Sequence, residues 1–144
     1  MTNLQAAIGV AQLERLSLHM QKKNFIGLYY TERLQHLTDK IQLPVAKISY
    51  ATNYYWVYGL VLKNSVSYDA QEIMSKLERL GIGTRPFFWP MHEQPVFKNM
   101  GWFSNESYPI AENIARRGFY IPSGLALTVE QMDYVIDCLA KVLG

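Results

Sequence analysis

Apolar residues recur at helical spacing along the first 37 positions. From Asn3 to Leu37 the leucine, isoleucine, methionine and tyrosine side chains return roughly once per helical turn, while charged residues such as Lys22 and Glu32 supply a polar side. The pattern predicts one long helix that bends near Gly27. A helix that begins this close to Met1 is typical of a chain whose preceding part is missing.

Small side chains crowd the opening turns of this predicted helix. Ala6, Ala7, Gly9 and Ala11 leave a smooth surface to which another backbone can come close, and Gly9 weakens the helix by about 1 kcal/mol relative to alanine. Either a second helix of the same domain or a separate partner surface covers it. We expect the isolated chain to dimerise or aggregate through this surface.

Strand and helix patterns alternate in the middle of the chain. The aromatic and β-branched run Tyr54–Leu62 predicts a buried strand at the centre of a sheet. Ser67 is predicted to cap a helix from Tyr68 to Leu80, which Gly81 ends, and Ile82–Arg85 is predicted to form a short strand.

Two further helices follow. Ser107 is predicted to cap a helix with Pro109 in its first turn, which leads into the strand Phe119–Ile121. Thr128 and Gln131 form a capping box at the start of the last helix. This order predicts an α+β fold with helices on one face of a small mixed or antiparallel sheet.

The length fits one domain. We expect residues 1–144 to form a single domain, with residues 1–37 as a long linking helix and residues 38–144 as a small α/β sandwich-like unit. Hydrophobic residues make up 49% of the chain and charged residues only 18%, which is a smaller charged fraction than is usual for a small domain. Part of the apolar surplus is therefore expected to face a partner.

Charge and cysteine usage exclude several function classes. A net charge of +2 without a basic run argues against nucleic-acid binding, and no stretch is long and apolar enough for a membrane helix. Cys138 is the only cysteine, so the chain can form no internal disulfide, and a cytoplasmic location is expected. His19 and His36 have no metal-ligand spacing, and no metal site is predicted.

The irregular segment from Pro86 to Tyr108 is longer than most loops, and its start carries the candidate chemistry. An arginine suited to phosphate or carboxylate, a histidine that titrates near neutral pH and three aromatic rings lie within Arg85–His92. This combination suits an anionic ligand with a flat part. A purely structural interpretation, with the aromatic residues anchoring the loop and Arg85 in an ion pair, has equal weight on these residues alone.

Three strings resemble one known family. Met1–Leu13 reads Met-Thr-Asn-Leu-Gln-Ala-Ala-Ile-Gly-Val-Ala-Gln-Leu, Gly81–His92 reads Gly-Ile-Gly-Thr-Arg-Pro-Phe-Phe-Trp-Pro-Met-His, and Arg117–Thr128 reads Arg-Gly-Phe-Tyr-Ile-Pro-Ser-Gly-Leu-Ala-Leu-Thr. They resemble segments of the DegT/DnrJ/EryC1/StrS family of sugar aminotransferases, which use pyridoxal phosphate. The resemblance implies the small C-terminal domain of a fold-type I aminotransferase, with the large cofactor-binding domain missing.

The resemblance also implies roles for individual residues. Arg85, His92, Phe88 and Trp89 would bind a nucleotide-linked sugar at the mouth of the active site. Asn3 would lie near the cofactor region, although a helix N-cap role is an equal alternative. The parent enzyme would be a homodimer that moves an amino group from glutamate onto a 4-keto-6-deoxy sugar nucleotide.

Catalysis needs residues that the family holds elsewhere. A pyridoxal-phosphate aminotransferase needs a lysine for the Schiff base and an acidic partner for the pyridine nitrogen. None of the eight lysines matches the family's motif for that role. We therefore expect no catalytic residue and no bound cofactor in this chain alone.

Two other hypotheses remain open. The chain could be a naturally short, non-catalytic module for binding or self-association. It could also be a separate enzyme that uses Arg85 and His92 alone, which would limit it to simple proton transfer.

Overall fold

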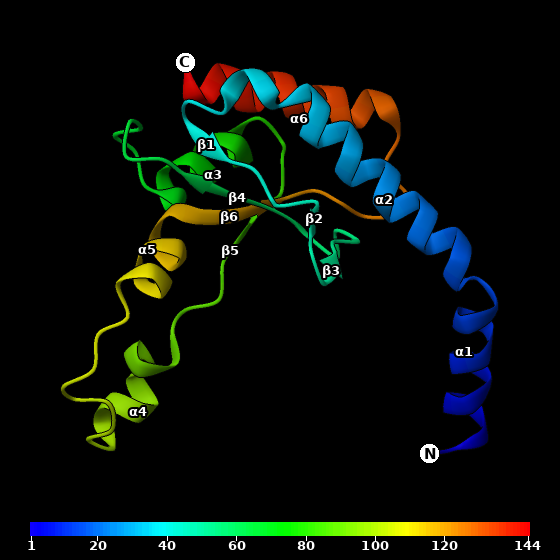
Figure 1. Cartoon of the computed structure of the whole chain (residues 1–144), viewed down its shortest axis with the longest axis horizontal. Helices are drawn as coiled ribbons and strands as arrows, with labels where there is room; N and C mark the ends of the chain where they lie inside the picture. Colours follow the sequence, from blue (N-terminus) through cyan, green and yellow to red (C-terminus); the bar gives the residue numbers. More distant parts are fainter.

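The computed structural model describes residues 1–144 (Figure 1). The helices are α1 (Asn3–Glu14), α2 (Leu16–Arg33), α3 (Ala70–Arg79), α4 (Pro95–Asn99), α5 (Pro109–Arg117) and α6 (Val129–Leu143), with 3-10 turns η1 (Gln35–Leu37) and η2 (Met91–Glu93). The strands are β1 (Ile41–Gln42), β2 (Lys47–Ile48), β3 (Ala51–Thr52), β4 (Tyr58–Leu62), β5 (Arg85–Pro86) and β6 (Gly118–Ile121). None of the helices combines the length and the hydropathy needed to span a bilayer.

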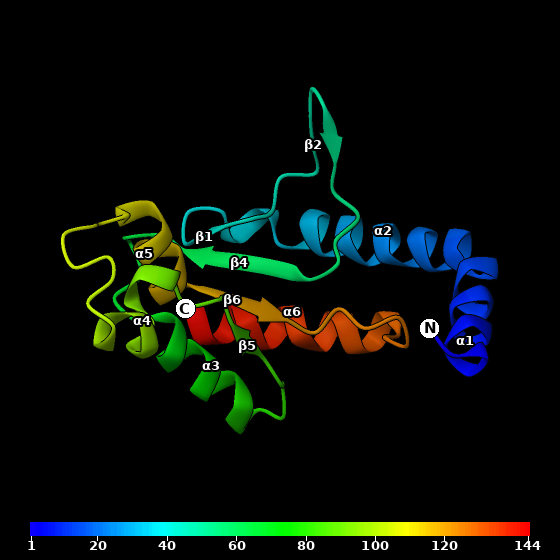
Figure 2. The same cartoon turned by 90° about the horizontal axis from the view of Figure 1, so that it is seen from below.

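Four strands form one antiparallel sheet in the order β1-β4-β6-β5. β4 is an interior strand, as predicted, but it begins at Tyr58 and not at Tyr54. Tyr55 has a φ of +53°, in the left-handed region, so an extended strand cannot run through it. β2 and β3 form a separate hairpin that projects from the body (Figure 2).

Alternation along the strands gives the sheet two different faces. Tyr58, Leu60 and Leu62 of β4 are buried, and Tyr58 and Leu60 pair across to the buried Ile121 and Phe119 of β6. These residues share one core with buried side chains of α2, α3 and α6, so three helices cover this face. The α+β prediction with helices on one face is confirmed, and the sheet is purely antiparallel.

The prediction of one continuous N-terminal helix with a bend at Gly27 was wrong. The helix is interrupted at Arg15, whose φ of −101° and ψ of 3° separate α1 from α2. Gly27 lies buried inside α2, where a Cβ would stand 2.1 Å from Cγ of the Tyr55 ring. The glycine therefore serves close packing against Tyr55 and leaves the helix unbroken.

α1 stands away from the rest of the chain (Figure 1). None of its residues is buried, and no heavy atom outside its own helix lies within 4 Å of a Cβ built on Gly9. Its exposed large apolar side chains are Leu4, Ile8, Val10 and Leu13. A second helix of this domain does not cover the small-residue surface.

The helix starts test the predicted caps. Ser67 does not cap α3, because Asp69 does so by accepting the Glu72 backbone N–H at 2.9 Å in a capping box. Asp69 lies directly before the first helical residue, where a side-chain oxygen can reach that N–H. The predicted box of Thr128 and Gln131 is confirmed at the start of α6.

Candidate functional site

The candidate loop leaves the sheet through its edge strand. In β5, Arg85 pairs with Tyr120 of β6, and the Phe87 backbone N–H donates to the Gly118 carbonyl at 3.3 Å. Arg85 is exposed and lines a hollow of about 520 Å³ that reaches Ser75 and Glu78 of α3. The guanidinium is therefore open to a ligand from solvent.

Phe87 anchors the loop on the face of the sheet that the three helices leave open. A Cβ on Gly59 would lie 2.7 Å from Cζ of Phe87, and a Cβ on Gly118 would lie 2.2 Å from its Cδ2. The ring also packs against Tyr120, with 4.7 Å between the ring centroids. The structural interpretation of the aromatic residues thus holds for Phe87.

Phe88 and Trp89 are more accessible. Phe88 is 77% exposed and meets Tyr120 only edge-on, with centroids 6.4 Å apart. Trp89 is 45% exposed, and the Arg116 guanidinium carbon lies 4.9 Å from the centroid of its ring. Both rings offer faces on which a planar or saccharide group can pack.

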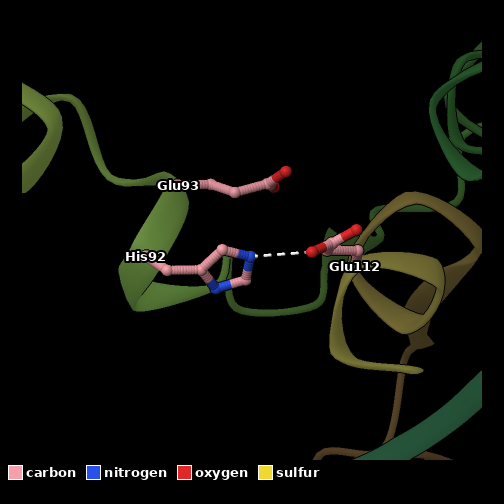
Figure 3. A group of neighbouring side chains, drawn as sticks. All are labelled: His92, Glu93 and Glu112. Atoms are coloured by element: carbon pink, nitrogen blue, oxygen red, sulfur yellow. Dashed lines mark hydrogen bonds and ion pairs between the residues drawn. The ribbon is translucent and has the colours of Figure 1, made fainter. Parts of the chain in front are cut away.

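His92 is only 9% exposed and is held by α5 (Figure 3). Its Nε2–H donates to Oε1 of Glu112 at 2.9 Å. The same carboxylate oxygen accepts the Tyr108 backbone N–H at 2.7 Å and the Ser107 hydroxyl at 3.2 Å. The predicted capping role of Ser107 was therefore wrong, because its hydroxyl is turned to this carboxylate and Tyr108 occupies the cap position without a side-chain bond.

These bonds determine the charge of Glu112. The backbone N–H of Tyr108, and then the His92 imidazole, lower the pKa of the Glu112 carboxyl from its ordinary value. Glu112 is therefore an anion at neutral pH.

Arg116, one helical turn after Glu112 in α5, also contacts the loop. Arg116 donates to Oε1 of Glu93 at 2.7 Å while it covers Trp89. No sequence motif had indicated a role for Glu112, Arg116 or Glu93. The only feature in the sequence that pointed to them was the spacing of four residues between Glu112 and Arg116. Such a spacing is usually typical of a solvent-exposed helix face.

The structure does not bring all the predicted site residues into one pocket. His92 lines a hollow of about 410 Å³ together with Lys98 and Trp102. The hollow beside Arg85 shares no residue with it. Arg85 and His92 thus lie at the two ends of one loop and face different hollows.

The N-terminal residues lie elsewhere. Asn3 is not the N-cap of α1, because Thr2 accepts the Gln5 backbone N–H at 3.3 Å and the Gln5 side chain accepts from Thr2. Both views place the N-terminus on the opposite side of the molecule from α4 (Figures 1 and 2).

Lys23 is a partly buried lysine with a structural role. Burial lowers the pKa of its ammonium, which donates to the carbonyls of Trp56 at 2.8 Å and Ser123 at 2.6 Å. Lys23 thus joins the loops that contain Trp56 and Ser123.

One family model matches residues 1–140, that of the DegT/DnrJ/EryC1/StrS aminotransferase family. The chain is similar to GDP-perosamine synthase of Caulobacter vibrioides, with 32% identity over 143 residues, and to that of Vibrio cholerae, with 32% over 140 residues. These matches cover 99% and 96% of this chain but only 38% and 36% of the relatives.

Solved structures show the same fold. Helicobacter pylori PseC, an aminotransferase involved in the biosynthesis of pseudoaminic acid, superposes with a TM-score of 0.85 over 96% of this chain and 36% of its own, at 16% identity. S. venezuelae DesV, solved with a ketimine intermediate, gives a TM-score of 0.81 at 25% identity over 95% of this chain and 35% of its own. This chain spans little more than a third of these proteins.

Proposed function

Since the chain belongs to the DegT/DnrJ/EryC1/StrS aminotransferase family, we propose that it is the C-terminal part of a nucleotide-sugar aminotransferase similar to GDP-perosamine synthase. The observation that carries this proposal is the 32% identity to the C. vibrioides enzyme over 99% of this chain. The reaction would transfer the amino group of glutamate to a 4-keto-6-deoxy sugar nucleotide.

Pyridoxal phosphate would supply the electron sink for this transfer when bound to the complete enzyme. The residues of this chain do not fit a cofactor site of their own. Burial lowers the pKa of Lys23, whose ammonium donates to two backbone carbonyls, and α1, which begins at Asn3, stands away from the rest of the chain (Figure 1). We assign the cofactor and the catalytic lysine to the part that the relatives have in addition, and expect no transamination by this chain alone.

The Arg85–His92 loop would bind the sugar nucleotide. The exposed Arg85 guanidinium is suited to phosphate oxygens, and Phe88 and Trp89 offer apolar faces to the sugar or the base. His92 would act mainly by holding the loop, because Glu112 occupies its Nε2. α5 would thus fix the position of the residues that meet the ligand.

The quaternary state and the compartment belong to the same proposal. The exposed apolar side chains of α1 support a contact with a large N-terminal domain and with a second subunit of a homodimer. A cytoplasmic location is in keeping with the single free thiol of Cys138.

The test is amination by the complete gene product from its own source, supplied with pyridoxal phosphate, glutamate and a GDP-linked 4-keto-6-deoxy sugar. Arg85→Gln should raise the KM for the sugar nucleotide by about tenfold or more, which is the loss of one charge-assisted hydrogen bond. Arg79→Gln is the matched control, because Arg79 is an exposed arginine of α3 outside the Arg85 hollow. An absence of pyridoxal-phosphate absorption and of glutamate-dependent amination would contradict the proposal.

A non-catalytic module for self-association is the second candidate, and the exposed apolar side of α1 favours it. This candidate predicts a stable dimer of the 144-residue chain that Leu13→Glu dissociates. An enzyme fragment with an exposed α1 is also expected to dimerise or aggregate, so the intact mass of the protein from its own source, and not light scattering alone, decides between the two candidates.

A further inference from the structure

Three metal-ligating side chains converge between η2 and α5 (Figure 3). One ligand atom from each of His92, Glu93 and Glu112 lies within 4.8 Å of the other two. His92 and Glu93 are adjacent in η2, and Glu112 reaches them from α5. All three are mostly shielded, with side-chain exposures of 9%, 14% and 26%.

The hydrogen bonds of this cluster are incomplete. Oε2 of Glu93 is buried and has no hydrogen-bond partner, while Arg116 takes only Oε1. A buried acceptor without a hydrogen-bond partner is destabilising, and more so when it is charged. Two carboxyl groups meet here, and Arg116 pairs with only one oxygen of Glu93, so a bound cation would supply the partner that Oε2 of Glu93 lacks.

We propose that His92, Glu93 and Glu112 form a binding site for one divalent cation of the zinc class. One imidazole nitrogen and two carboxylate oxygens suit Zn²⁺ better than Mg²⁺ or Ca²⁺, which take oxygen ligands. The cation would replace the proton that His92 Nε2 now shares with Glu112. The hollow of about 410 Å³ beside the cluster leaves room for a water molecule as fourth ligand.

The geometry requires only small shifts. Zinc ligands at about 2.0–2.1 Å from the metal stand roughly 3.3 Å from one another in a tetrahedron. The 2.9 Å between His92 Nε2 and Glu112 Oε1 would widen slightly, and the most distant ligand atom would move inward from at most 4.8 Å. The cation would then join η2 to α5 and fix the end of the Arg85–His92 loop.

The experiment titrates ZnCl₂ into the metal-free 144-residue chain by calorimetry and records the zinc X-ray absorption spectrum of the complex. We expect one Zn²⁺ per chain and a shell of nitrogen and oxygen near 2.0 Å. Glu93→Gln keeps the shape of the side chain and should weaken binding more than about tenfold, since even outer partners of a metal ligand contribute that much. His92→Gln should have the same effect.

Matched variants control for other zinc ligands. His36→Gln changes an exposed histidine, Glu106→Gln changes a carboxylate that lines the same hollow, and Cys138→Ser removes the thiol, so all three should bind as the unchanged chain does. Circular dichroism verifies that each variant is folded. If His92→Gln does not fold, the comparison of Glu93→Gln with the unchanged chain decides the test.

Three results would overturn the proposal: no binding by the unchanged chain, equal binding by Glu93→Gln and Glu106→Gln, or a sulfur shell near 2.3 Å. The titration contains no sugar nucleotide and no pyridoxal phosphate. Its failure therefore leaves the proposed aminotransferase function untouched.

Discussion

The packing of Phe87 between Gly59 and Gly118 gives a quantitative test of how the loop is held. A methyl group added at Gly59 would lie 2.7 Å from the Phe87 ring. Overpacking costs about 1–3 kcal/mol, and replacing a strand glycine with alanine returns about 0.5–1 kcal/mol. Gly59→Ala should therefore lower the free energy of unfolding by about 0.5–2 kcal/mol.

Gly118→Ala should cost more. Its methyl group would meet the ring at 2.2 Å and the Ile114 carbonyl oxygen at 2.5 Å, and this oxygen belongs to the backbone of α5 and cannot turn aside. Gly83→Ala is the matched control, because nothing lies within 4 Å of its added Cβ, and it should stay within about 0.5 kcal/mol of the unchanged chain. Urea unfolding ranks the three variants by their free energy of unfolding, provided that the m-value, the slope of this free energy with urea concentration, is the same for all of them.

A double-mutant cycle isolates the contact with the ring. In a Phe87→Ala background the added methyl group at Gly59 has no ring to meet, so Gly59→Ala should lose most of its cost. Equal urea midpoints for Gly59→Ala, Gly118→Ala and Gly83→Ala would contradict the tight contact of Phe87 with the two glycines. An equal cost of Gly59→Ala with and without the Phe87 ring would contradict it as well.

Two further predictions concern the helix cap and the buried tyrosines. Asp69→Ala should cost about 1 kcal/mol of stability by removing the capping box of α3, whereas Ser67→Ala should be neutral in the same urea assay, and equal effects would contradict the observed cap. Burial raises the pKa of Tyr58 to about 12 from 10.0, so its contribution to stability is complete below pH 10 and is lost as pH rises from 10 towards 12. Unfolding free energies across that interval should fall less steeply for Tyr58→Phe, and parallel curves would show that Tyr58 titrates normally.

The sequence predicted the fold class because its periodicities are local. The capping box at Thr128, the stop at Gly81 and the interior position of β4 follow from residue types at fixed spacing, and all three are confirmed. The errors arose where a distant contact decides the outcome. In the sequence Gly27 resembled a helix breaker. In the structure the ring of Tyr55 packs against it, and the helical periodicity around Gly27 carries no information about so distant a residue.

The candidate site was predictable only in part. The composition of the loop indicated Arg85 and His92, and their roles in ligand binding stay predictions. The sequence could not show that α5 contacts the loop. The partners of His92 and Trp89 are Glu112 and Arg116, which lie 20 or more positions away and have no distinguishing feature in the sequence. Glu112 and Arg116 therefore came from the structure alone.

The most direct test of the central claim is the intact mass of the protein isolated from its own source. As the C-terminal part of a sugar aminotransferase, the chain should occur in a polypeptide of about 2.6 to 2.8 times 16.6 kDa, because it covers 38% and 36% of the length of its GDP-perosamine synthase relatives. A mass of 16.6 kDa would contradict the account and would make this chain an independent module.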